Sequence, residues 1–222
     1  MMFSNDFWHP LKFSLEVASI SVIIVCFFGI VFARLLYNKS FKGKMLLETF
    51  LMLPIVLPPT VIGFLLIYFF GRQSPVGAFI EEFFQHSIMF TPWAAIIAST
   101  TVAFPLMYQS VKLGFQAVDI DIENAARVDG GNKMKVFLFV SLPLSLPSVI
   151  SGLIMSFARA LGEFGATLMF AGNIPGKTQT APTAIYVAME SGNMSLAWSF
   201  VLSMVVISFL MLLLSNFVQK KP

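Results

Sequence analysis

Three groups of residues in this sequence have types and spacings that could do chemistry. Arg159 and Glu163 stand four residues apart in an apolar run, a spacing that places both on one face of a helix. The segment AGNIPGKT at 171–178 nearly matches the loop that holds nucleotide phosphates. Glu81 and Glu82 are adjacent acids, a residue type used in general acid–base catalysis. These groups would indicate, in turn, a charged path, a nucleotide site and an enzyme.

The near match to a phosphate loop fails on its context. Ala171 stands where the first glycine belongs, and the motif needs a buried parallel strand before it and a helix after it. Here a long apolar run comes first, and Pro175 and Pro182 lie within and just after the segment. We expect instead an external or re-entrant loop rich in Gly and Pro, followed by a short helix at 183–190.

The adjacent acids have a plainer interpretation as well. Large apolar residues recur at helical spacing around them in the segment 79–84, which predicts an interfacial helix whose wet face carries Glu81 and Glu82. His86 has no second metal ligand close to it, so we assign no metal site. The sequence shows no set of nucleophile and base, and we do not expect an enzyme.

Arg159 and Glu163 leave two interpretations open. Charged residues within an apolar run are costly and usually face a partner or a cavity. The pair could be a structural ion pair that closes a helix end, or it could line the mouth of a path. Gly162 and Gly165 stand beside the pair and would let a backbone or a ligand come close, which favours the second interpretation.

The composition indicates that a membrane bundle must position these residues. Of the 222 residues, 57% are hydrophobic and 11% are charged, and the mean hydropathy is +0.84. Soluble domains carry roughly twice that share of charge, about 25%. The polar residues gather in a few intervals between runs that are long enough to cross a bilayer. We therefore expect an all-α integral membrane protein with little room for a soluble domain.

The apolar runs predict five spans, with six as the alternative, although the sequence offers no clear candidate for the sixth. Their approximate bounds are 11–36, 46–70, 92–111, 136–160 and 196–218. Pro58 and Pro59 interrupt the second span and Pro105 the third. Proline frees backbone carbonyls and kinks a helix, so these positions are candidates for moving or path-lining segments.

The basic residues predict the orientation of the spans. With the N-terminus outside, one side of the membrane holds ten lysines and arginines and the other holds three, with Arg159 set aside as intramembrane. Basic residues concentrate in cytoplasmic loops, so the side with ten is predicted to be cytoplasmic, together with the C-terminus. The ten are Arg34, Lys39, Lys42, Lys44, Lys112, Arg127, Lys133, Lys135, Lys220 and Lys221, and the three are Lys12, Arg72 and Lys177.

The polar interval 118–143 lies on the predicted cytoplasmic side. Asp119 suits a helix N-cap, and Gly130 and Gly131 suit the left-handed conformation that ends a helix. A helix this short needs a surface to dock on, which could be a partner protein or the membrane surface. A narrow face of small and apolar residues recurs at helical spacing: Val118, Ile122, Ala125 and Ala126.

This interval resembles the coupling loop of ABC importer permeases. The family pattern is Glu-Ala-Ala, three residues, Gly, nine residues and then Ile-x-Leu-Pro. The present chain has NAA at 124–126, Gly130, and VSLP at 140–143, so the spacing agrees at both ends. It departs from the pattern at Asn124, which occupies the glutamate position, while an acid, Glu123, stands one place earlier.

Four further segments resemble molybdate permease subunits in the sulfate/molybdate group of these importers. They are LPIVLPPTVIG, FPLMYQSVKL, LPLSLPSVISG and SFARALGEFGATLMFAGNIPGKTQTAPTAIY, and the likeness runs from about residue 8 to 215. The resemblance implies the type I ABC importer permease fold, as one transmembrane domain over 1–222 with its core at about 8–218. It also implies a cytoplasmic coupling loop at 113–135.

The resemblance implies a membrane-spanning subunit of an ATP-driven importer for molybdate or a related oxyanion. Two copies would pair in the cytoplasmic membrane of a prokaryote, and each would dock the helix within 119–131 on one of two cytosolic ATPase subunits. Those subunits would bind ATP-Mg, whereas this chain would bind no cofactor. An extracytoplasmic binding protein would deliver the oxyanion.

The resemblance also assigns candidate residues to two roles. The residues expected to couple the chain to the ATPase are Asp119, Ile122, Glu123, Asn124, Ala125, Ala126, Arg127, Asp129 and Gly130. Those expected along the translocation path or at its gate are Pro58, Pro59, Pro105, Arg159, Glu163 and Gly165.

Alternative functions remain open at this point. The substrate could instead be sulfate, thiosulfate or tungstate. From another class, the chain could be a stand-alone anion channel or a secondary transporter, with a membrane anchor or assembly protein as a third option. The spans carry almost no ionisable groups beyond Glu16, Arg34, Arg159 and Glu163, which argues against coupling to protons.

Overall fold

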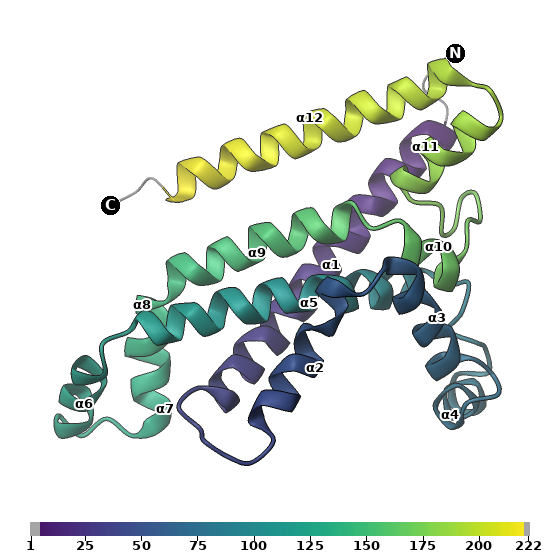
Figure 1. The fold of residues 1–222 in the computed structure, drawn as a ribbon. Helices are drawn as coiled ribbons and strands as arrows, with labels where there is room; N and C mark the ends of the chain where they lie inside the picture. Colours follow the sequence, from purple (N-terminus) through teal and green to yellow (C-terminus); the bar gives the residue numbers. More distant parts are fainter. Residues whose placement is uncertain (1–4, 220–222) are drawn as a thin grey trace.

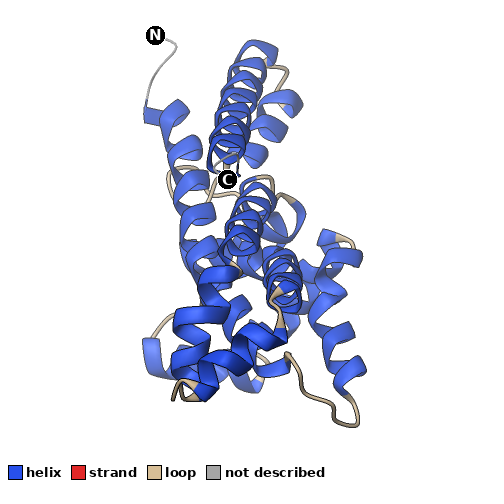
Figure 2. Ribbon diagram, turned by 90° about the vertical axis from the view of Figure 1, so that its left-hand side faces the viewer, coloured by secondary structure: helices blue, strands red, loops and turns tan. Residues whose placement is uncertain are grey.

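The computed structural model describes residues 5–219, and every regular element in that range is a helix, as Figure 1 and Figure 2 show. The first elements are α1 (Asn5–Leu36), α2 (Lys44–Val56), α3 (Pro59–Phe70), α4 (Pro75–Phe84), α5 (Pro92–Ala117) and α6 (Ile120–Val128). They are followed by α7 (Lys133–Val136), the π-helical segment η1 (Phe137–Ser141), α8 (Leu142–Leu144), α9 (Leu146–Leu161), α10 (Gly165–Ala171), α11 (Ala181–Glu190) and α12 (Met194–Gln219).

Helix α5 is the centre of the bundle, because it packs against α1, α2, α9 and α10. Its small residues, such as Ala94 and Ala103, are fully buried, so neighbouring backbones approach it closely. Two serine hydroxyls donate hydrogen bonds to its carbonyl oxygens. Ser21 of α1 bonds Ile96 at 3.1 Å, and Ser156 of α9 bonds Ala103 at 3.3 Å. Such bonds hold helices together where apolar packing alone gives little specificity.

The helices confirm the predicted all-α membrane fold. Three of them are long and apolar enough to cross a bilayer, over Phe7–Leu36, Pro92–Ala117 and Met194–Leu213. Two bent pairs raise the number to five if each pair is one span, in agreement with the five predicted spans. Large apolar side chains are exposed along α2 and α12, as expected for surfaces that contact lipid.

The second predicted span, 46–70, is not one kinked helix. It is divided into α2 and α3, which meet at an angle of 116°. Leu57 and Pro58 between them have extended backbones, with ψ of 140° at both residues. Each of them precedes a proline, and the residue before a proline is driven out of the helical conformation. Two consecutive prolines therefore break the helix rather than kink it.

The fourth predicted span, 136–160, is also interrupted. The segment Lys133–Leu144 meets α9 at 67°, and η1 lies within that segment. The Ser145 hydroxyl donates hydrogen bonds to the carbonyls of Ser141 at 2.8 Å and Leu142 at 3.0 Å. A serine of this kind satisfies carbonyls near a break caused by prolines, here Pro143 and Pro147.

The two short helices outside the spans are confirmed. The predicted interfacial helix is α4, which exposes Phe79 and Phe83, and Glu81 forms an ion pair with Arg72 at 3.2 Å. The predicted helix at 183–190 is α11. The segment that resembles a phosphate loop follows the short helix α10 and continues as a loop, with no strand before it in the described range. This arrangement lacks the strand that a phosphate loop requires.

Candidate functional site

Helix α6 forms as the sequence predicts, with a cap at each end. The Asp119 carboxylate accepts a hydrogen bond from the Asp121 amide at 2.9 Å. At the other end Gly130 has φ of +89°, its amide bonds the Arg127 carbonyl at 3.1 Å, and the Gly131 amide bonds the Ala126 carbonyl at 3.0 Å. These bonds make up a Schellman motif, which satisfies the last carbonyls of the helix. The short helix is thus defined by its own sequence.

The outward face of α6 differs from the face that periodicity predicts. Val118 is buried and Ala126 is half-buried, whereas Ile122 and Ala125 are exposed. Val128 joins this outward face and is 87% exposed. Figure 1 places α6 and α7 together at one end of the molecule, beside the turn from α1 to α2 and away from α11. The helix therefore presents small and apolar side chains outward from that end.

Glu123 points to the interior of the chain, although the motif groups it with docking residues. It is 1% exposed, and its Oε1 accepts a hydrogen bond from the Ser141 hydroxyl of η1 at 2.5 Å. Its Oε2 forms an ion pair with Arg127 at 2.7 Å. Helix α6 contacts the rest of the described chain through α7 and η1. The bond from Glu123 to Ser141 therefore attaches α6 to the π-helical segment of the fourth span.

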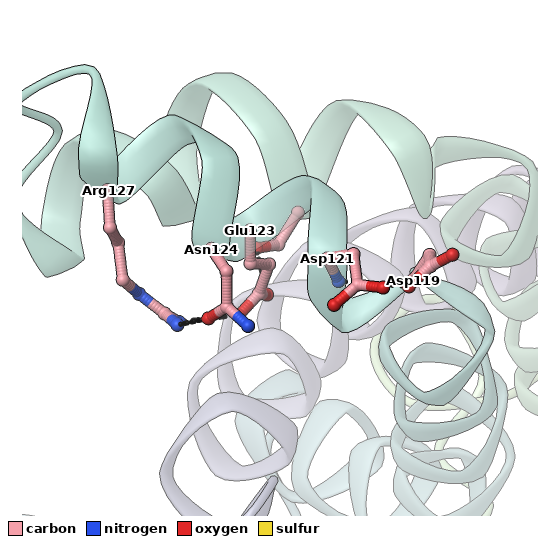
Figure 3. Close-up of polar contacts among 6 residues, drawn as sticks. Asp119, Asp121, Glu123, Asn124 and Arg127 are labelled. Carbon is pink, nitrogen blue, oxygen red and sulfur yellow. Dashed lines mark hydrogen bonds and ion pairs between the residues drawn. The ribbon is translucent and has the colours of Figure 1, made fainter.

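Arg127 folds back along the helix, as Figure 3 shows, and contacts two neighbouring side chains. Besides its ion pair with Glu123, its guanidinium donates a hydrogen bond to the Asn124 side-chain oxygen at 2.7 Å. Asn124, which stands at the glutamate position of the pattern, thus orients Arg127 through its neutral side-chain oxygen. The Arg127 side chain is still 40% exposed, so it borders the outward face.

Most of the residues expected along a path gather at a second place, where the turn from α9 to α10 meets the start of α3. Arg159 pairs with Glu163 at 2.6 Å, and Glu163 accepts a hydrogen bond from the Ala166 amide at 2.8 Å. A Cβ at Gly165 would lie 2.9 Å from the Cβ of Pro59, which follows Pro58 directly. Glu163 thus links the last turn of α9 to the first turn of α10, consistent with a structural ion pair. The remaining candidate, the proline at 105, is buried in α5.

We expect Arg159→Ala to destabilise the protein by about 3 kcal/mol, because it leaves the Glu163 carboxylate buried without its ion-pair partner. Thermal unfolding of the purified protein measures the loss. The double variant with Glu163→Gln should recover most of that stability, since no unpaired charge then stays buried. Equal instability of the single and double variants would contradict the role given to the buried charge. Uptake by the stable double variant separates the open interpretations: low uptake supports a charged path, and normal uptake a structural pair.

Two residues of the site were missed from the sequence. Ser141 lies eighteen positions after Glu123, inside an apolar run, and no local pattern connects the two. Val128 had a usable signal, because it follows Ala125 by three residues on the same side of the helix. The motif specifies the two alanines and the glycine, whereas Val128 occupies one of its unspecified positions.

Residues 26–222 match the family described as "Binding-protein-dependent transport system inner membrane component". The chain is 56% identical to the putative molybdenum transport system permease protein YvgM of Bacillus subtilis, over 98% of this chain and 95% of that protein. It is 38% identical to the molybdenum transport system permease protein ModB of Escherichia coli K12, over 99% and 96% of the two chains.

A solved structure shares the fold. It is the crystal structure of a bacterial ABC transporter involved in the import of the acidic polysaccharide alginate. The TM-score is 0.79 at 14% sequence identity, and the match covers 99% of this chain and 80% of the other. At that identity the likeness concerns the arrangement of helices alone.

Proposed function

The chain belongs to the family of binding-protein-dependent transport system inner membrane components, and we propose that it is the permease subunit of an ATP-driven molybdate importer. The observation that carries the proposal is α6. It is a doubly capped helix with an outward apolar face, and a buried Glu123–Ser141 bond attaches it to a membrane span. A protein that lacks a nucleotide-binding fold in its described residues would need such an attachment to receive motion from a separate ATPase.

The family supports the kind of partners that we propose. Two copies of the chain pair in the membrane, and each α6 docks on one of two cytosolic ATPase subunits, which hold ATP-Mg. The N-terminus lies outside and the C-terminus in the cytoplasm, because the basic residues concentrate on the side that carries α6. A binding protein delivers the substrate from outside, in keeping with the family's description.

The substrate assignment rests on the relatives. The two that are named above, at 56% and 38% identity over nearly the full chain, are both described as molybdenum permeases. Molybdate is a dianion, and Arg159, with 31% of its side chain exposed, supplies a positive charge near the junction of α3 and α10. Glu163 neutralises much of that charge, so contact with the dianion is weak and transient. Such contact suits a permease whose binding protein performs the selection.

The mechanism is alternating access by rigid-body motion. Closure of the ATPase pair pushes α6, and the Glu123–Ser141 bond transmits the displacement to η1 and then to α9. The break between α8 and α9 at Ser145 and the break between α2 and α3 provide places where the spans change direction. The bundle then alternates between inward-open and outward-open states.

Reconstituted transport tests the substrate and the energy source. The chain is assembled with its ATPase subunits in liposomes, with ATP on the side of α6 and the binding protein with labelled molybdate on the other side. We expect uptake that requires ATP and that tungstate reduces more than sulfate does. Uptake without ATP would favour a channel or secondary transporter.

Capture of the ATPase subunit tests the docking face. Val128→Asp should weaken capture at least about tenfold, because it places an unpaired charge in an apolar contact. Val76→Asp is the matched control, since Val76 is also exposed but lies on α4. Equal capture by both variants would show that α6 is not the docking helix.

A further inference from the structure

A pocket of about 520 Å³ lies where the end of α1 meets α6, α7 and η1. Its lining contains four basic residues and one acid, a balance of +3, and the acid is Glu123, which is already paired with Arg127. The other basic residues in the lining are Arg34, Lys39 and Lys133. None of these three forms an ion pair with another described residue. The pocket therefore offers three positive charges without an internal counter-ion.

The geometry holds one of these charges in place. The Arg34 guanidinium carbon lies 4.9 Å from the ring centre of Phe137, the first residue of η1. A guanidinium stacked on a ring keeps its edge N–H groups available for hydrogen bonds to an anion. Arg34 is also in the last turn of α1, close to the level at which that span leaves the bilayer. An oxyanion in the pocket would therefore meet an oriented donor group.

One wall of the pocket, formed by α1, carries apolar side chains. Val31 and Leu35 of α1 line it, and they continue a row of apolar side chains at intervals of four residues that includes Ile23 and Phe27. Ile23 and Phe27 are 69% and 64% exposed, and Leu35 is 51% exposed. The row leads from the pocket along the outside of a membrane span. A soluble anion would make no favourable contact with this apolar row, whereas a lipid acyl chain would pack along it.

We propose that this pocket binds the head group of an anionic phospholipid from the leaflet on the α6 side. Arg34, Lys39 and Lys133 surround the phosphate, and an acyl chain lies along Ile23, Phe27, Val31 and Leu35. Basic pockets between membrane helices on the cytoplasmic side are suited to such head groups. The lipid then contacts α1, α7 and η1 together, next to α6, which carries Glu123. The proposal requires that α1 spans a bilayer, but it does not require that the chain transports molybdate.

Native mass spectrometry of the purified full chain tests the site directly. The protein is mixed with phosphatidylglycerol and phosphatidylcholine, and we expect it to retain phosphatidylglycerol preferentially. Arg34→Gln combined with Lys133→Gln should reduce that retention roughly tenfold to thirtyfold, since each basic residue near a membrane surface contributes about 1 kcal/mol. The control is Lys42→Gln combined with Lys135→Gln, which removes one charge from the turn between α1 and α2 and one from α7, both outside the pocket lining.

The outcomes distinguish a lipid site from diffuse surface charge, from a soluble-anion site and from an interface between copies. Equal losses in both double variants would indicate diffuse charge and overturn the proposal, as would displacement of the lipid by inorganic phosphate or molybdate. Binding to the single chain but not to its dimer would overturn it too, and would assign the pocket to the interface between copies.

A second measurement uses the wild-type chain, so it tests the site even if the variants fail to fold. Photoactivatable phosphatidylglycerol on the wild-type chain should label the peptides around 31–35 and 133–137, and labelling elsewhere contradicts the site. Loss of molybdate transport alone would leave all these results unchanged, so the lipid site and the proposed function can fail separately.

Discussion

Glu123→Ala is expected to lower molybdate uptake about tenfold or more while ATP hydrolysis by the complex continues. The substitution removes a carboxylate that bonds Ser141 at 2.5 Å and Arg127 at 2.7 Å. Hydrogen bonds to charged groups contribute about 1.5–3 kcal/mol each, and a loss of about 1.4 kcal/mol changes a population tenfold. The outward face of α6 stays intact, so the ATPase still docks, but its motion no longer reaches η1. Uptake per ATP hydrolysed in liposomes is the measurement.

Two further variants show whether the bond to Ser141 is responsible. Ser141→Ala removes only the hydroxyl and leaves the ion pair between Glu123 and Arg127, and we expect it to reduce uptake per ATP as well. Asp121→Asn is the control, because it removes a negative charge from the exposed side of the same helix. Normal uptake per ATP in Ser141→Ala would contradict transmission through the Glu123–Ser141 bond. The effect of Glu123→Ala would then be due to loss of the ion pair with Arg127.

Gly130→Val is expected to abolish most uptake while leaving insertion and yield unchanged. Gly130 has φ of +89°, a conformation that costs roughly 1–3 kcal/mol for a β-branched residue such as valine. Apart from the glycine and its two neighbours in the chain, no atom lies within 4 Å of a Cβ built at this position, so the strain is in the backbone and not in packing. The backbone relieves it by giving up the Schellman bonds, and the end of α6 loses its shape. Uptake and membrane-fraction yield measure the two effects.

Controls for Gly130→Val separate loss of the helix end from general strain. Gly130→Asn should keep much of the activity, because asparagine tolerates the left-handed conformation. Gly192 has φ of +74° and equally open space, but it lies between α11 and α12 at the other end of the molecule. Gly192→Val should therefore preserve uptake. If it abolishes uptake as Gly130→Val does, the strain acts on the whole fold and not on α6.

The sequence predicted the features that depend on local chemistry. Long apolar runs predicted the spans, since each must satisfy its own backbone in lipid. Asp119 and the two glycines predicted the ends of α6, because capping involves residues within a few positions of each other. The absence of a strand pattern before Ala171 was enough to reject a phosphate loop. The motif around Gly130 also predicted the family, which the comparisons confirm.

Prediction was less successful where distant segments meet. The angle of 116° between α2 and α3 depends on two consecutive prolines, and the sequence indicated only that a kink should occur. Periodicity grouped Val118 and Ala126 with the outward residues of α6, but it cannot tell which side of a short helix faces the bundle. The family pattern placed Glu123 among the docking residues, whereas packing against η1 turns it inward.

The order of polar and apolar residues along the chain was thus sufficient to determine a membrane bundle, its five apolar runs and the capped helix on its basic side. Only the tertiary structure decided that Glu123 reaches Ser141, that the turn after α9 lies on Pro59, and that Arg34, Lys39 and Lys133 line one pocket. The physical reason is that capping and partition into lipid act on neighbouring residues. The burial of a carboxylate or the gathering of like charges depends instead on which helices pack together.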